Sequence, residues 1–239
     1  MNLKHSLCIL SAFWLTLGAD AKPNKSATPV QIRAVLHDPA NPAAELFYPE
    51  KKGTLVKLEF RPQDLTLPLS MLPVDGTLVL YDKVGVDPKN PAASVAASVK
   101  LPPNIKRAVV VVSPAPAGSK PAYRMELIDD SAQAFPKGES RVISLVPMET
   151  TLDVGEHQLK IPPGVVTRVP AVTKVDEYNM APTSFHYKEG DSPVTFSERQ
   201  LQYLDGFRRV FIVHTAPGGS QLSITTIVDT ATAVVPKRR

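Results

Sequence analysis

Apolar and polar residues alternate along most of the chain. Val56, Leu58 and Phe60 alternate with Lys57 and Glu59, and residues 123–127 and 157–161 follow the same period of two. Half-buried strands require this period, because successive side chains point to opposite faces of a sheet. The pattern therefore predicts an all-β fold.

Turn signals separate the predicted strands, for example at Asp75-Gly76 and at residues 162–164 and 217–219. Gly155-Glu156 fits a two-residue hairpin turn with glycine first. Residues 109–112 and 211–213 are apolar at every position, which predicts a central strand in each case. About seven short strands per hundred residues favour β-sandwiches. One short helix is expected over residues 198–204, capped by Ser197 and ended by Gly206.

Two segments of the chain match each other without a gap. Residues 107–119 align with residues 208–220 at a spacing of 101, with seven of thirteen positions identical. After a two-residue deletion, residues 123–131 align with residues 222–230, and both copies read as a β-hairpin. The starts of the halves match more faintly, as residues 33–35 and 141–143. A chance likeness between valine-rich strands is the alternative, but the shared Ala-Pro-x-Gly-Ser turn favours internal duplication.

The spacing of this repeat is the size of a domain. The boundary is expected at residues 135–138, so that residues 28–135 form β-sandwich domain 1 and residues 136–233 form β-sandwich domain 2. Residues 22–27 are expected to be a flexible N-terminus of the mature chain. Residues 234–239 are expected to be a solvated basic tail.

Residues 146–155 and 159–164 give a strand, a short turn, a second strand and a Pro-Gly step. This rhythm resembles that of exported bacterial proteins with tandem immunoglobulin-like β-sandwich domains, and the resemblance implies that fold. The layout is also similar in size to two-domain periplasmic pilus chaperones. Those chaperones hold a client's C-terminus with a basic pair in the cleft between their domains, and no residues of this sequence are matched to that pair.

The first 21 residues have the order of a secretory signal peptide. Lys4 precedes an apolar run over residues 7–17, and Ala19-Asp20-Ala21 fits a cleavage site. Eleven helical residues span about 16 Å, against about 30 Å of membrane hydrocarbon, so an uncleaved anchor is disfavoured. The sequence therefore predicts export to the periplasm or the extracellular space, with Lys22 as the first mature residue and no membrane span.

Composition and charge narrow the function classes. The chain carries 24 prolines among 239 residues, which argues against a mostly helical fold. Cleavage would remove Cys8, the single cysteine, and with it all thiol and disulfide chemistry. The net charge of +4 is scattered along the chain, whereas nucleic-acid binding needs a basic patch. We therefore expect no nucleic-acid partner.

No recognised catalytic or metal-binding spacing occurs in the sequence. His157 and His214 fall in predicted strands, and His37 is expected to be solvated beside a proline-rich turn. The acidic pairs at residues 129–130 and 176–177 are expected to be solvated, because adjacent strand residues point to opposite faces. The sequence thus predicts no catalytic residue, no metal and no cofactor.

One polar stretch, residues 174–192, combines charged residues with large contact-forming side chains. Such side chains on loops are enriched at protein contacts, although an ordinary strand would instead bury some of them. The possible protein-contact residues are Tyr178, Met180, Phe185 and Tyr187.

The prediction is a non-enzymatic exported module of the cell envelope, structural or binding a protein that the sequence does not identify. Two alternatives stay open. One is a periplasmic assembly chaperone that donates a strand to its client. The other is a hydrolase or carbohydrate-active enzyme, which would place two convergent carboxylates, or a histidine and an acid, in a deep polar pocket.

Overall fold

The computed structural model describes residues 28–52, 54–85 and 91–230, and the regular secondary structure of these residues is almost entirely β-strand. The predicted signal peptide, residues 22–27 and the basic tail lie outside the described residues. The first eight strands are β1 (Val30–Leu36), β2 (Phe47–Lys51), β3 (Thr54–Lys57), β4 (Leu69–Met71), β5 (Thr77–Tyr81), β6 (Val95–Lys100), β7 (Arg107–Pro114) and β8 (Tyr123–Asp129).

These eight strands form two four-stranded sheets, which we call the first unit. One sheet has the order β4-β1-β7-β8 and the other β3-β2-β5-β6. β1 and β7 are parallel, and the other pairs are antiparallel. Ile32 and Val110 from one sheet and Leu78 and Leu80 from the other share a buried core. The first unit is therefore a sandwich of two sheets.

The next eight strands repeat this arrangement as a second unit. They form sheets of order β12-β9-β15-β16 and β11-β10-β13-β14, again with one parallel pair, β9 with β15. Their core includes Val142, Leu152, Phe185 and Phe211. The strands are β9 (Ser140–Ser144), β10 (Thr150–Val154), β11 (His157–Ile161), β12 (Val166–Val169), β13 (Met180–Glu189), β14 (Ser192–Gln202), β15 (Arg208–Thr215) and β16 (Leu222–Asp229).

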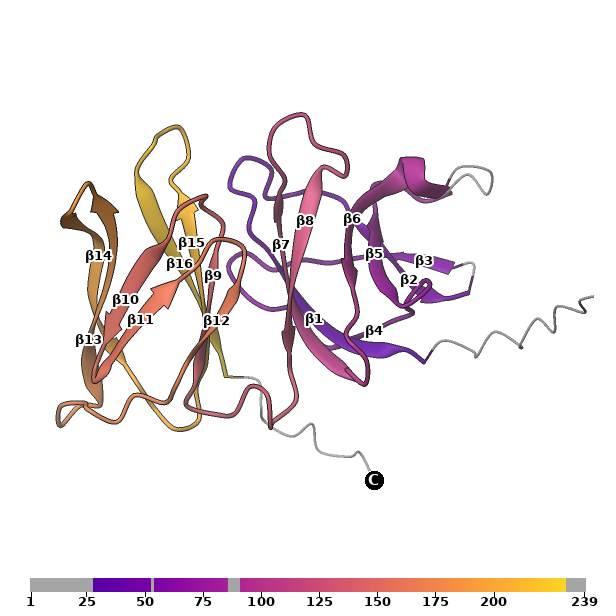
Figure 1. The fold of residues 1–239 in the computed structure, drawn as a ribbon. Helices are drawn as coiled ribbons and strands as arrows, with labels where there is room; N and C mark the ends of the chain where they lie inside the picture. The colour runs from indigo at the N-terminus through magenta and orange to yellow at the C-terminus, as the bar shows by residue number, and fades with distance from the viewer. Residues whose placement is uncertain (1–27, 53, 86–90, 231–239) are drawn as a thin grey trace, which may run out of the picture.

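The two units stack so that the four sheets form successive layers (Figure 1). A third buried cluster joins the β1-β7-β8 sheet to the β9-β15-β16 sheet. Val109 and Val111 from β7 lie in this cluster with Val210 and Ile212 from β15. The molecule therefore has three apolar layers, one inside each unit and one between them.

This third layer explains the strands that are apolar at every position. In β7, Val110 and Val112 face the core of the first unit, whereas Val109 and Val111 face the second unit. In β15, Phe211 and Val213 face inward, and Val210 and Ile212 face the first unit. Both faces of each strand are buried, as expected for a near-continuous apolar run.

The short helix predicted over residues 198–204 is wrong. Residues 198–202 belong to β14, which pairs with β13 over its whole length. The helix-capping pattern at Ser197 does not determine the structure here, because the long hairpin already satisfies the backbone N–H and C=O groups of these residues with hydrogen bonds between its strands. Among the described residues, the one helical turn is the 3₁₀ segment η1 (Pro91–Ser94).

Within the described residues, the structure contains no helix long and apolar enough to cross a membrane.

Truncation of Val111 or Ile212 to Ala is expected to lower the free energy of unfolding by about 2–4 kcal/mol each. Both side chains are 0% exposed between the two units. Urea unfolding of the purified protein measures the effect. Val165→Ala, at a position that is 48% exposed, is the control and should change stability by less than about 0.5 kcal/mol. Interface variants as stable as the control would contradict the burial of both positions.

Candidate functional site

The predicted contact segment, residues 174–192, is a tight turn followed by β13 and the start of β14. The turn spans residues 176–180 and is closed by the Asp176 carboxylate, which accepts hydrogen bonds from the backbone N–H groups of Tyr178 and Met180 at 2.9 and 2.8 Å. Asn179 has a positive φ of 59°, which asparagine tolerates in turns. The turn is therefore held in one conformation by its own side chain.

Neighbouring strands also hold this turn. The amide of Gln202, at the end of β14, donates to the Tyr178 carbonyl at 3.1 Å, and the Tyr203 N–H donates to the Asn179 carbonyl at 2.7 Å. The Tyr178 side chain nevertheless points away from the protein and is 68% exposed. A large aromatic ring thus projects into solvent from a rigid support.

The segment that leads into the turn is anchored by Glu156. Its carboxylate accepts hydrogen bonds from the backbone N–H and hydroxyl of Thr173 and from the Lys174 N–H. Burial raises the pKa of Glu156, but these hydrogen bonds outweigh it and lower the pKa to about 2. Glycine is required beside it, because Gly155 has a φ of 53° and a Cβ there would lie 2.5 Å from Val172 Cγ1.

The other three predicted contact residues are less exposed than Tyr178. Phe185 is 2% exposed and packs in the core of the second unit, with its ring 5.5 Å from that of Phe211. It is unavailable for contact, because the alternation of β13 turns it inward. Tyr187 is half-buried, with its ring 6.1 Å from that of Phe196, and Met180 is half-buried at the start of β13.

A buried cluster of four charges lies between the two units. Arg33 on β1 contacts Asp229 at 2.6 and 2.9 Å and Asp130 at 2.9 Å. Arg208 on β15 contacts Asp130 at 2.7 Å and also pairs with Asp229. All four side chains are 4% exposed or less. Each arginine therefore bridges carboxylates from both halves of the chain.

The protonation of this cluster is fixed by its partners. Burial raises the pKa of Asp229, but Arg33 and Arg208 outweigh it and hold the pKa below its ordinary value of 3.8. Burial lowers the pKa of Arg33, but the two aspartates outweigh it and raise that pKa. Arg33 and Asp229 are thus held in their charged forms.

The predicted solvation of the acidic pair at residues 129–130 is wrong for Asp130, which is 3% exposed. Its main partners lie far away in sequence, on β1 and β15. A local pattern therefore could not reveal them. The nearest sequence signal is the repeat alignment, which matches Asp130 with Asp229 and Arg107 with Arg208.

The connection between the units is buried with this cluster. Phe135 is 1% exposed, and its ring contacts two guanidinium groups, at 4.5 Å from Arg141 and 4.2 Å from Arg208. Its carbonyl accepts a hydrogen bond from Arg208 at 2.8 Å. The connecting residue is therefore part of the interface and not a free linker.

A histidine pair marks the other end of the interface. The rings of His37, directly after β1, and His214 on β15 lie 4.3 Å apart. His37 is half-buried, which corrects the expectation that it is solvated. Burial and the nearby His214 lower the pKa of His37 to about 4, against a smaller opposing effect of Asp38. His37 is therefore neutral at physiological pH.

The remaining histidines make polar contacts within the second unit. His186 on β13 lies 3.1 Å from the Asp153 carboxylate and 2.9 Å from the Thr195 hydroxyl. These three residues occupy neighbouring strands β10, β13 and β14. His157 contacts the Ala171 carbonyl at 3.0 Å. No group of three or more potential metal ligands is found in the described part of the chain.

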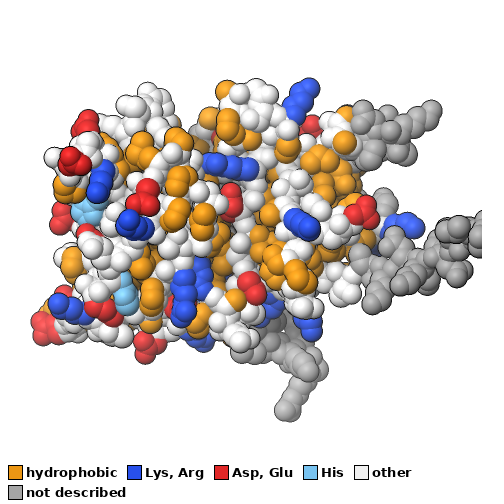
Figure 2. All heavy atoms as spheres, in the orientation of Figure 1, with side chains coloured by type: hydrophobic (Ala, Val, Ile, Leu, Met, Phe, Trp, Pro, Cys, Tyr) orange, Lys and Arg blue, Asp and Glu red, His pale blue; other side chains and the backbone are white. Residues whose placement is uncertain are grey.

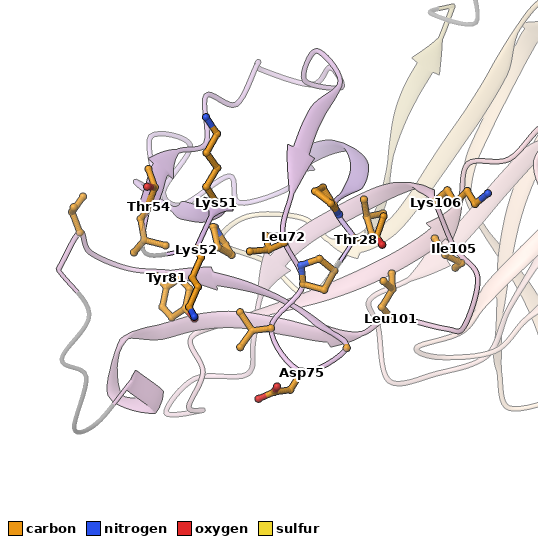
Figure 3. A pocket seen from close by; sticks show the side chains of 18 of the residues that line it. Thr28, Lys51, Lys52, Thr54, Leu72, Asp75, Tyr81, Leu101, Ile105 and Lys106 are labelled. Atoms are coloured by element: carbon orange, nitrogen blue, oxygen red, sulfur yellow. The ribbon is translucent and has the colours of Figure 1, made fainter. Parts of the chain in front are cut away.

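A hollow with a volume of about 1290 Å³ lies in the first unit. Figure 3 shows Lys51, Lys52 and Lys106 around it, with Leu72 and Tyr81 among its walls. This volume exceeds the range usual for small-molecule pockets. A smaller hollow of about 490 Å³ in the second unit includes Tyr187 and Phe196. On the face in Figure 2, basic and acidic side chains are scattered, with no single charged patch.

Comparison with known proteins adds little. No protein-family model matches the chain, and no curated protein matches it either. A solved structure of a proposed cell adhesion protein from Bacteroides uniformis is similar over 87% of this chain and 99% of that chain, with 6% identity and a TM-score of 0.19. A likeness this weak carries no argument about the fold or the function.

Replacing Asp229 with Ala is expected to lower the free energy of unfolding by about 3–5 kcal/mol, because two buried guanidinium groups would each lose a partner. Chemical unfolding measures the loss. The control is Lys57→Ala, which breaks an exposed ion pair with Glu45 and should leave the unfolding midpoint unchanged. Equal midpoints for both variants would mean that the buried cluster does not stabilise the fold.

As the pH falls, the free energy of unfolding should decrease first through protonation of His37 in the unfolded chain, and only at lower pH through protonation of Asp229. The folded-state pKa of His37 is about 4 and its ordinary value is 6.5, so the unfolded chain takes up this proton first. That contribution to stability is present above pH 6.5 and is lost as the pH falls towards 4. The Asp229 contribution is lost only below its ordinary pKa of 3.8. Unfolding free energies of wild type and His37→Phe between pH 7 and 4 test this, and the variant should show the shallower slope. Parallel slopes would count against it.

Proposed function

We propose that this protein is an exported, non-enzymatic module of the cell envelope that binds another protein through the turn at residues 176–180. The observation that carries the proposal is the Tyr178 ring, 68% exposed on a turn closed by the Asp176 carboxylate. Tyrosine is enriched among the residues that contribute most to binding energy. The first 21 residues support export, because they have the order of a signal peptide.

The rigidity of the turn supports a role in recognition. Binding costs free energy when mobile side chains and loops must be ordered. Here the backbone on both sides of Tyr178 is already fixed by Asp176 and Gln202, so a partner would have only the ring to immobilise. The acidic neighbours Asp176 and Glu177 keep the free surface soluble.

The proposal includes an origin by duplication of one sandwich, immunoglobulin-like in outline. Its support is the identical strand order of the two units and the parallel pairs β1–β7 and β9–β15. Arg107 and Arg208 begin equivalent strands, and Asp130 and Asp229 occupy matched positions in the repeat. One difference between the units is that β2 and β5 pair at a single position, whereas β10 and β13 pair at five.

The two alternative functions fit the geometry less well. A strand-donating chaperone would need accessible basic side chains between its domains, whereas Arg33 and Arg208 are buried and bound to aspartates. A hydrolase would need a histidine beside an acid, and His186 lies beside Asp153. Those two residues and Thr195 are cross-strand neighbours on one sheet, where polar pairs commonly stabilise the sheet itself.

The test is capture of a partner from an extract of the source organism's cell envelope. Immobilised wild-type protein should retain a specific protein, and Tyr178→Ala should lose most of it at an unchanged melting temperature. The ring is exposed, so its removal should not unfold the protein.

Leu67→Ala is the matched control, because Leu67 is 66% exposed in the first unit. It should capture the same protein as wild type. Equal capture by Tyr178→Ala and Leu67→Ala would refute the assigned surface, and no specific capture by wild type would count against the binding function itself.

A further inference from the structure

We infer that the cavity between the two units, beside the His37–His214 pair, binds a small neutral aromatic molecule that carries a hydroxyl group. The cavity has a volume of about 360 Å³. An engineered apolar cavity of about 150 Å³ is already large enough to bind benzene, so one substituted ring fits here. Ligand sites of this size occur preferentially at domain interfaces.

The walls of the cavity come from both units. The first unit contributes the end of β1 and the segment after it, together with Phe60 and Pro62 beyond β3. The second unit contributes Ile212 and His214 from β15 and Thr225 from β16. Flat proline and aromatic surfaces with branched aliphatic side chains favour an apolar, planar ligand.

The His37 ring offers a ligand a polar group at the junction of the two units. Both ring nitrogens of His214 are engaged, with the Thr215 carbonyl and the Thr225 hydroxyl, each at 3.0 Å. Within the described residues, neither ring nitrogen of His37 has a hydrogen-bond partner. The neutral His37 ring carries a lone pair that accepts a hydroxyl hydrogen.

The charges around the cavity favour a neutral ligand. Asp38 and Arg61 both line it and carry opposite charges. The Asp38 carboxylate is already engaged, because it accepts hydrogen bonds from the Ala40 and Asn41 N–H groups and from the Tyr123 hydroxyl. With His37 neutral, the lining has no net charge to compensate an ionised ligand.

The probes for the test are para-cresol and toluene, which differ in the hydroxyl group. Amide signals of His37, His214 and Thr225 in two-dimensional NMR spectra should shift with saturation for both probes. Para-cresol should bind about three- to tenfold more tightly, the effect of one neutral hydrogen bond. His37→Phe keeps a planar ring without the acceptor and should bring the ratio of the two affinities close to one.

Two further variants separate cavity binding from surface binding. Thr225→Leu places a larger apolar side chain in the cavity and should weaken both probes. Ser220→Leu, at an exposed position in the turn between β15 and β16 and outside the cavity lining, should leave both affinities unchanged. The proposal fails if neither probe shifts these amides at millimolar concentration. Equal affinities in wild type would overturn the role of His37, and equal effects of the two leucine variants would overturn the location.

Discussion

The outer faces of the two central sheets bury each other, and the other features of the molecule follow from this contact. A two-sheet sandwich normally leaves the outer face of each sheet in water. Here Val109, Val111, Val210 and Ile212 on those faces are 0% exposed. Either unit alone would expose a continuous apolar surface, which monomeric soluble proteins seldom do. The two units therefore form one folded body.

Apolar contact alone does not fix how two sheets sit on each other, because it has no preferred direction. The Arg33, Asp130, Arg208 and Asp229 cluster supplies that direction, since each arginine must meet carboxylates from both halves at hydrogen-bond distance. Buried ion pairs are expensive to desolvate and add little net stability. Their clearest effect here is specificity, because a shifted stacking of the units would leave four buried charges unpaired.

The sequence predicted the local elements well and the interface poorly. Period-two alternation and turn signals indicated β8 and the β10–β11 hairpin, whereas of the alternating residues 56–60 only the first two lie in β3. The all-apolar runs at residues 109–112 and 211–213 lie in β7 and β15, which sit inside their sheets. Those same runs did not reveal what covers their outer faces, because a central strand of any buried sheet has the same pattern. The prediction that Asp130 is solvated was wrong, because its charged partners lie on strands that are distant in the sequence. The contact segment was partly predictable, because the alternative that an ordinary strand would bury some of its large side chains holds for Phe185.

The interface between the two units is closely packed at one end and contains a cavity at the other. Towards the connecting segment the interface is closed by the arginine–aspartate cluster and by Phe135, whose ring two guanidinium groups contact. At His37 and His214 the apolar layer gives way to a cavity whose walls still belong to both units. A molecule that binds there would stabilise the stacked arrangement by an amount that keeps growing with the ratio of its concentration to its Kd, because it would bind the folded state and not the separated strands. The Tyr178 ring, in contrast, projects from a unit that the interface already holds in place, so that the proposed recognition would require little further ordering of the protein.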